Sequence, residues 1–396
     1  QAYSAEAYLD FDETNLLPLL ASVLPRSGSV EVAGASGQLW LLFNEEGITQ
    51  AQGSLDEVSL IGEDTAGEHE YQISTGSIDL AVRQNNENNW DIWASNLEFD
   101  FFNRPWESGD FFINVSTPGE ELALDVKAET VDLAILNDML ELVNLPEQAQ
   151  QALRDLRPRG QLRNMHLQTD FSGSYPGGFS LAANLDQVAV DAWTSAPSGQ
   201  GINAYVEADM DSGFVELDSG DFSIHLPRVF ADGWTYSSIN GRVHWAVTDE
   251  RVRVYSDTID ARNPDIHGRV KFDVRNQRTP EGGWDSNLTL LVGALDFNVR
   301  EKSLYLPTLS NIRNTMDWLD TALLSGQVEN SGFVFRGKTT NLIHPKQRTV
   351  KTFYQASNAS LQFLQSWPPL EEASAFVYVR DNVVDVTASS DRKSVV

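Results

Sequence analysis

The side chains that most often perform chemistry are sparse in this sequence. It contains six histidines, and none of His225, His244 and His267 has a second histidine or a carboxylate at a spacing typical of a metal site. His225, His244 and His267 each lie in a strand-like run, where an ordinary structural role is expected. Cysteine is absent, which excludes thiolate zinc sites, cysteine nucleophiles and disulfides.

One acidic stretch, Ala208–Asp221, briefly resembles a calcium-binding loop because Asp209, Asp211 and Gly213 alternate within it. An EF-hand loop also needs glycine at its sixth position and glutamate at its twelfth, and Phe214 and Gly220 occupy these positions here. The stretch is better interpreted as a turn, a strand FVEL and a second turn. No metal is predicted.

Paired carboxylates such as Glu98 and Asp100 could act as acid and base, but an exposed sheet face explains them more simply. A glycosidase pair stays open as an alternative, because its two members need not be close in the chain. No G-x-S-x-G elbow, P-loop, dinucleotide fingerprint or H-E-x-x-H motif is present. We therefore predict no catalytic residue and no cofactor.

The composition narrows the choice of partners. The 396 residues include 57 acidic and 28 basic side chains, and the net charge is −29. Nucleic acid is not expected as a partner, since phosphate binding needs clustered Lys and Arg. No apolar run reaches the roughly 18 residues that a membrane span needs. The chain starts at Gln1 without a signal peptide, so we expect a fragment of a longer protein.

Most of the chain has the pattern of β-strands. Short runs alternate apolar and polar residues and are bounded by Gly, Asn, Asp and Pro. Leu97, Phe99 and Phe101 share one face of such a run, as do Val243, Trp245 and Val247 of another. Since these runs recur about every ten residues, we expect antiparallel neighbours joined by hairpins.

Three segments have the periodicity of amphipathic helices, at about 14–25, 131–156 and 308–324. In the second, Leu133, Leu136, Met139, Leu140 and Val143 form one stripe before Pro146 starts a shorter helix. Gly326 suits the C-terminal cap of the third.

Each helix is followed by Gly-x-Val or Gly-x-Leu and then by a strand, with the glycines at Gly28, Gly160 and Gly326. A second landmark, SLDEVSL at Ser54–Leu60, recurs as NLDQVAV at Asn184–Val190 and more loosely as NASLQFL at Asn358–Leu364. We therefore predict three repeats at 1–130, 131–306 and 307–396, the last one truncated. The predicted fold is mainly β: an elongated, strongly curved antiparallel sheet that forms an open gutter, with a few helices packed on it.

Several stretches resemble a known family. They are the helix with Gly-x-Val, the tract GFVFRG, the run SWPPLEEASA, and IHLPRVFADGWTYSSINGRVHW at Ile224–Trp245. Together they resemble the AsmA-like family, and most closely its YhdP branch, over about Gly28–Ser389. The membrane anchor expected of that family is missing from this sequence.

The resemblance implies a periplasmic part of a protein anchored in the inner membrane of Gram-negative bacteria. Its expected partners are phospholipid acyl chains, carried along an apolar groove between the inner and outer membranes, in support of the cell envelope. The family implies no catalytic residue, cofactor or metal.

Strands that are apolar on both faces supply the candidate groove residues. Phe333 and Phe335 come from GFVFRG, Leu291 from LTLLVGALDF, and Phe376 and Tyr378 from AFVYV. Which face contacts lipid stays open for the two-sided runs. The ten tryptophans leave a different class open, an extracellular adhesin or glycan-binding protein, although Trp245 and Trp318 lie on or beside apolar stripes. A glycoside-active enzyme is a weaker alternative.

Overall fold

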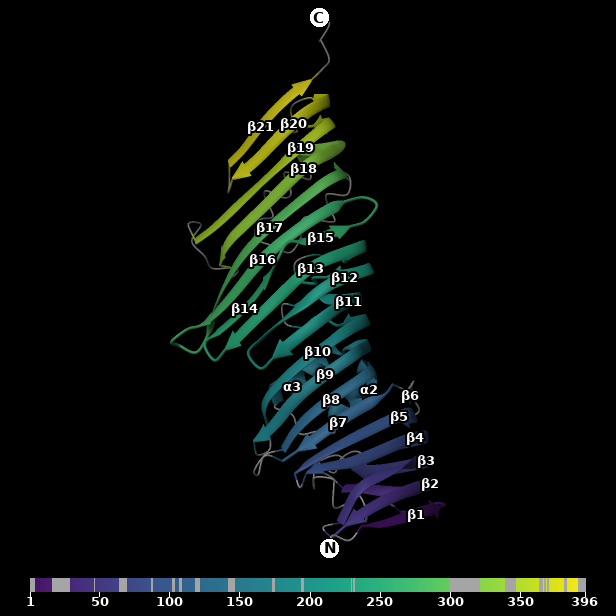
Figure 1. Cartoon of the computed structure of the whole chain (residues 1–396). Coiled ribbons are helices and arrows are strands. Elements are labelled where there is room, and N and C mark those ends of the chain that lie inside the picture. The colour runs from purple at the N-terminus through teal and green to yellow at the C-terminus, as the bar shows by residue number, and fades with distance from the viewer. Residues whose placement is uncertain are drawn as a thin grey trace, which may run out of the picture. The chain divides into compact units, whose positions relative to one another are not determined.

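The computed structural model describes most of the chain: residues 4–15, 29–45, 47–63, 70–86, 88–101, 104–106, 109–117, 122–141, 147–172, 175–193, 196–228, 230, 232–299, 321–338, 347–362, 366, 368, 370–380 and 383–390. Within these residues the protein is almost entirely β, and its strands belong to one 21-stranded antiparallel sheet (Figure 1). The prediction of a mainly β antiparallel fold is confirmed. The chain divides into two compact units, Gln1–Asp186 with Glu207–Met210, and Gln187–Val206 with Asp211–Val396.

The first unit contains the opening strands, which pair mainly with their neighbours in chain order. Their bounds are β1 Ala5–Phe11, β2 Ser29–Asn44, β3 Gly47–Glu63, β4 Glu70–Asn86, β5 Asn89–Phe101, β6 Arg104–Trp106, β7 Phe111–Ser116, β8 Leu122–Asp132 and β9 Arg159–Ser172. β10, Tyr175–Val190, begins here and ends in the second unit. β5 pairs with both the short β6 and β7.

Two helices, α2 Leu133–Glu141 and α3 Glu147–Leu156, connect β8 to β9. The carboxylate of Asp132 accepts hydrogen bonds from the backbone N–H groups of Ala134 and Ile135 at 2.9 and 3.0 Å, which caps the start of α2. Ile135, 2% exposed, is the most buried residue of α2 for which burial is described, although the predicted stripe omitted it.

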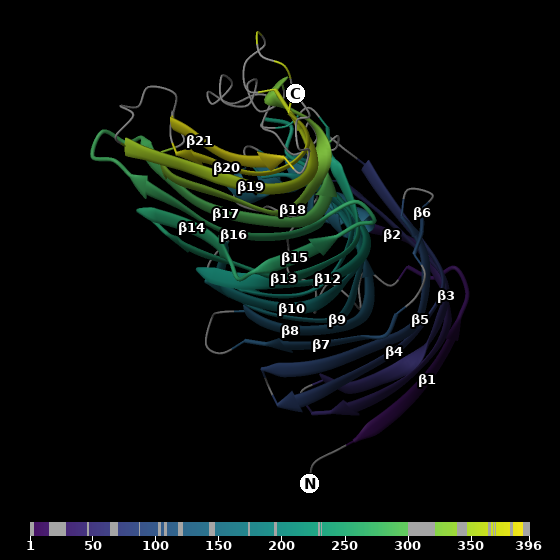
Figure 2. The same cartoon turned by 90° about the horizontal axis from the view of Figure 1, so that it is seen from above.

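The second unit contains most of β11 Ser198–Asp209 and all later strands. These are β12 Ser212–His225, β13 Trp234–Thr248, β14 Arg251–Ser256, β15 Ile259–Arg262, β16 His267–Arg278, β17 Trp284–Asn298, β18 Leu323–Lys338, β19 Arg348–Leu361, β20 Leu370–Arg380 and β21 Val383–Ser390. In Figure 2 the ribbons β16 to β19 bend along their length, so the sheet of this unit is curved.

Many strands contain a point, called a bulge below, at which one polar residue adopts a left-handed backbone conformation. Asn164, Asp221, Asp296 and Asn358 have φ values of 50°, 51°, 55° and 49°. The residue after each of them is buried, and so is the residue two positions before it: the pairs are Leu162 and Met165, Ser219 and Phe222, Ala294 and Phe297, and Ala356 and Ala359. The buried spacing thus changes from two to three at each bulge, which keeps one face buried while the strand bends.

A residue in the same left-handed conformation also occurs in one landmark motif of the predicted repeat. Glu57 of SLDEVSL and Gln187 of NLDQVAV occupy the same position in their motifs, and their φ values are 55° and 50°. The repeat boundaries themselves stay a prediction.

Two local predictions are wrong, and a third concerns residues that the structure mostly does not describe. Gly326 is not a helix cap, because β18 has already begun at Leu323; its φ of 135° and a backbone atom of Ala359 2.8 Å from a would-be Cβ make it a close-approach glycine. The run DSGD at Asp218–Asp221 is not a turn, because β12 continues through it with a bulge. Nearly all of the helix predicted at about 14–25, and nearly all of that predicted at 308–324, lie outside the described residues.

Candidate functional site

The first unit has one face that is apolar across consecutive strands. Leu41 of β2 lies opposite Ala51 of β3, and the register continues the row through β4, β5, β7, β8 and β9. The further members of the row are Val82, Ile92, Ile113, Val126 and Leu167. Each is aliphatic, and we call this side the apolar face of the first unit.

The neighbouring row of the same strands is polar. Arg83, Asp91, Asn114, Asp125 and Gln168 lie opposite one another in turn. The amide of Asn114 donates a 2.7 Å hydrogen bond to Asp91, and Gln168 donates a 2.9 Å bond to Asp125. Since successive side chains of a strand point to opposite faces, the polar row faces away from the apolar one.

The second unit repeats this division. Its apolar face includes a row from β16 to β21, with one threonine among aliphatic and aromatic residues: Val270, Val292, Phe333, Thr352, Val379 and Val384. The hydroxyl of Thr352 donates a 2.9 Å hydrogen bond to the carbonyl of Gly332, so its polar group is satisfied. A parallel row continues the face onto β13 and β14 through Trp245, Val254, Val274 and Leu288.

The exposure of the apolar face varies along the strands. Towards the end of β17, the face carries a buried cluster that includes Ala294, Phe297, Val328 and Ala356. A second cluster joins Phe222, Ile239, Ile259 and Ala261. Outside these buried clusters, Leu290, Val292, Phe333 and Phe335 are only half-buried. The face therefore offers apolar side chains that a ligand can still reach.

The two-sided run AFVYV illustrates how sharply the two faces of this unit differ. Val377 and Val379 are each 1% exposed, whereas Phe376 between Ala375 and Val377 is 45% exposed. Phe376 instead stacks on Phe353 of β19, with ring centroids 6.0 Å apart. The run is therefore apolar on both faces but buried on only one.

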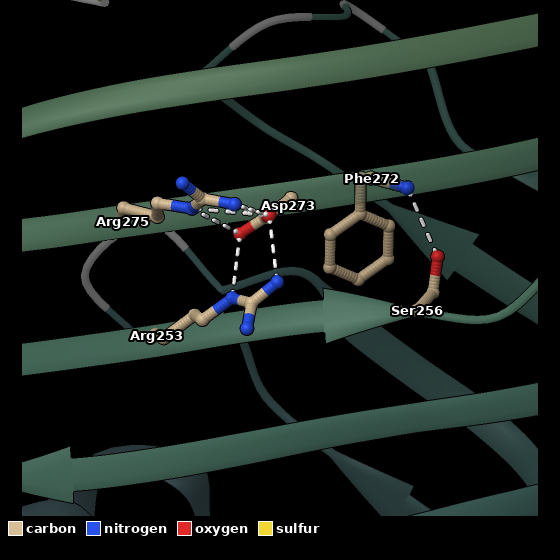
Figure 3. A network of polar contacts seen from close by, with 5 residues as sticks. All are labelled: Arg253, Ser256, Phe272, Asp273 and Arg275. Atoms are coloured by element: carbon tan, nitrogen blue, oxygen red, sulfur yellow. Dashed lines mark hydrogen bonds and ion pairs between the residues drawn. The ribbon is translucent and has the colours of Figure 1, made fainter.

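The opposite side of the second unit, its polar face, is held by ion pairs between strands. Figure 3 shows Asp273 of β16 between Arg253 of β14 and Arg275 of its own strand. Hydrogen bonds from Arg253 and then Arg275 lower the pKa of Asp273 to about 2. On the same strands, the hydroxyl of Ser256 accepts a 3.0 Å bond from the backbone N–H of Phe272 where β14 ends.

A second cluster on this face surrounds Asp260. Its carboxylate accepts from Arg262 at 2.8 Å, from Arg269 at 3.1 Å, and is 2.7 Å from the ring Nε2 of His267. These contacts, with Arg262 first, hold the pKa of Asp260 far below its usual range. His166 and His244 also lie within 2.9 and 3.4 Å of a carboxylate, contacts that the sequence spacing did not reveal.

None of these groups assembles a metal centre in the described part of the chain, where no three metal-ligating side chains come together. Asp209 and Asp211 of the calcium-like stretch lie at the turn between β11 and β12. Glu98 and Asp100 lie on the exposed side of β5.

The structure distributes the five groove candidates over both faces. Phe333 and Phe335 lie on the apolar face with Val292 and Leu290 opposite them. Leu291, Phe376 and Tyr378 lie on the polar face, where Leu291 is 43% exposed. Lipid contact by any of them stays a prediction. The sequence reasoning did not select Leu290, Val292 and Val270 as groove residues. The alternation of Val270, Phe272 and Val274 with polar residues could have identified an apolar face on β16.

The comparisons with known proteins give one match. The family model described as YhdP protein matches residues 2–392 of the chain. This chain belongs to the YhdP family. No curated protein and no solved structure matches it. Membership in the YhdP family places the chain among AsmA-like proteins of the Gram-negative envelope, a group with a role in lipid transport. The helices among the described residues lack the length and the apolar character that a membrane span requires.

Proposed function

We propose that the apolar faces of the two units bind phospholipid acyl chains, and that this protein carries them through the periplasm between the inner and outer membranes. The observation that carries the proposal is the row of apolar side chains that crosses strand after strand in each unit, from Leu41 to Leu167 and from Val270 to Val384. An acyl chain has no polar atoms and needs such a surface without interruption.

Energetics support this use of the apolar face. Each buried CH2 group contributes about 0.8 kcal/mol, so an acyl chain laid along several strands would be held by many small contributions. Such contacts have no fixed direction, which allows a chain to move along the rows. The half-buried state of Leu290 and Phe335 leaves room for this contact.

The proposal requires no catalysis, and we propose that the protein is not an enzyme. The carboxylates of Asp260 and Asp273 on the polar face are engaged by Arg253, Arg269 and His267 in ion pairs that join neighbouring strands. The role of these groups is therefore to hold the strands in register. The apolar face is the surface that binds the acyl chains.

The test is to purify the protein from a membrane-containing lysate and to extract and identify bound lipid by mass spectrometry. Phospholipid in a reproducible ratio to protein is expected. Leu290→Gln should lower that ratio, whereas Thr289→Gln, a change at the neighbouring position on the polar face, should leave it unchanged. Lipid-free protein that binds glycans on an array would overturn the proposal in favour of a glycan-binding role.

A further inference from the structure

The polar face of the second unit contains a hollow that the acyl-chain proposal does not use. It lies over β17 and β18, where Gly293 and Gly332 are directly opposite each other, and its volume is about 460 Å³. Two glycines side by side remove two side chains from a face that is otherwise covered. The volume falls in the range of small-molecule sites, about 300–1,000 Å³.

Apolar side chains form part of its wall. Leu291 is 43% exposed, and its neighbour Val334 lies directly opposite it on β18. The ring of Phe353 lies over Gly332, where a Cβ atom would come within 2.5 Å of it. An apolar wall of this kind on a charged face is energetically unfavourable in water, and a ligand with an apolar part would cover it.

The same hollow is lined by three cations, Arg269, Lys271 and Lys351. Arg269 is paired with Asp260, but Lys271 and Lys351 form no ion pair within the described residues. They lie in one row of the register, Lys271–Leu291–Val334–Lys351, on opposite sides of Leu291 and Val334, and therefore stand on opposite sides of the hollow. With neighbouring strands about 4.8 Å apart, their backbones are about 14 Å apart.

Unpaired lysines are notable in a chain with a net charge of −29, because carboxylates are in excess nearly everywhere. An inorganic anion would use the lysines and leave Leu291 and Phe353 exposed to water. A neutral apolar molecule would cover these side chains and leave the lysines without a partner. A ligand that combines an anionic group with a short apolar body satisfies both.

We propose that this hollow binds an anionic amphiphile, with its acidic head group at Lys271 or Lys351 and its apolar part against Leu291, Val334 and Phe353. The side chains that would hold the ligand lie on the opposite face from Leu290 and Phe335, so their site is separate from acyl-chain binding on the apolar face. It gives the second unit a second ligand surface.

The experiment follows methyl NMR signals of the whole protein during titration with a short-chain anionic lipid, dihexanoyl phosphatidylglycerol, below its micelle concentration. The methyl groups of Leu291 and Val334 should shift, and a ligand restricted to this hollow should leave those of Val254, which is half-buried on the apolar face, unchanged. Dihexanoyl phosphatidylcholine and inorganic phosphate serve as separate arms. Both should bind at least about tenfold more weakly, because each lacks either the net charge or the apolar part.

Gly293 provides a sharp blocking variant. A Cβ atom there would meet only the carbonyl of Ser331, at 3.8 Å, so Gly293→Leu should fill the hollow without a clash. Gly220→Leu on β12 is the matched control, since a Cβ there would meet only the carbonyl of Ser237, at 3.6 Å. We expect loss of the shifts in Gly293→Leu, an affinity about tenfold lower in Lys271→Gln/Lys351→Gln, and no change in Gly220→Leu.

Three results would overturn the proposal. The first is the absence of shifts at Leu291 and Val334 with the anionic lipid. The second is equal affinity for the zwitterionic lipid, which would show that the lysines do not select charge. The third is equal binding of inorganic phosphate, which would show that the apolar wall is not used. If only the methyl groups of Val254 on the apolar face shift, the hollow does not bind the lipid, while the proposal for the apolar face survives.

Discussion

Arg253 of β14 donates two hydrogen bonds to Asp273 of β16, at 3.0 Å from Nε and 2.9 Å from Nη2. The next residue along each strand, Val254 and Val274, forms a directly opposed pair on the other face. One pair of strands thus carries an ion pair on one side and an aliphatic contact on the other. This division recurs across both units and underlies the predictions below.

Stability should depend on pH through Asp273. Its pKa is lowered from 3.8 to about 2 by the bonds from Arg253 and Arg275, so the stabilisation is full above about pH 4 and is lost as pH falls through 2. We expect Asp273→Asn to lower the free energy of unfolding by about 1–2 kcal/mol at pH 7, after allowance for solvent screening. Urea unfolding should show this difference in the free energy of unfolding between the wild-type protein and Asp273→Asn at pH 7. At pH 2 the difference should largely disappear. Asp249→Asn, in the turn after β13, is the control; an equal loss there would contradict this account.

Charge substitutions on β20 should separate the two faces. Val377→Asp buries a carboxylate without a partner and should cost at least about 3 kcal/mol. Phe376→Asp changes the adjacent residue, which is 45% exposed, and should cost less than about 1.5 kcal/mol. Denaturant midpoints measure both. Similar losses for the two variants would show that the faces are not divided in solution.

Two glycines on paired strands should respond oppositely to alanine. Gly326→Ala forces a Cβ atom to within 2.8 Å of the Ala359 backbone at a φ of 135°, and should destabilise by about 2 kcal/mol or more. Gly293→Ala meets no such obstacle and should be neutral or stabilising by about 0.5 kcal/mol. Thermal unfolding of both proteins tests this, and a stable Gly326→Ala variant would refute the close approach.

A photo-crosslinking amino acid should capture lipid from one face of β18. Placed at Phe335 on the apolar face, it should label phospholipid acyl chains in cells. At Arg336, the next residue, which lies on the polar face and does not line the hollow, it should not. Mass spectrometry of the adducts gives the readout. Preferential capture at Arg336 would show that the polar face is the one in contact with lipid.

Local pattern made much of the architecture predictable. The alternation at Leu97–Phe101 and in GRVHWAV predicted strands, and both lie in strands, where Leu97 and Phe99 share a side, as do Val243, Trp245 and Val247. The helices at 131–156 were predictable for the same reason, since an apolar stripe and Pro146 are both visible in the sequence. Periodicity is a property of neighbouring residues, so it needs no knowledge of distant ones.

The bulges were not predicted, although a faint signal exists. Pairs such as Ala294 and Phe297 are apolar residues three apart, with Asp296 between them and the second apolar residue. In a single strand, a spacing of three conflicts with the period of two expected for one face. The two residues are therefore not recognised from the sequence as lying on the same face. It becomes meaningful only when the partner strand shows that both residues lie on the buried face.

The sequence by itself determined that this chain forms many antiparallel strands, a few helices and no catalytic constellation that its motifs could reveal. Only the tertiary structure decided which side of a two-sided run is buried, and so separated Phe333 and Phe335 from Leu291, Phe376 and Tyr378. The reason is physical. A strand fixes which residues alternate, but burial depends on what its partners in the sheet place beside and over each side chain, and those partners lie far away in the chain.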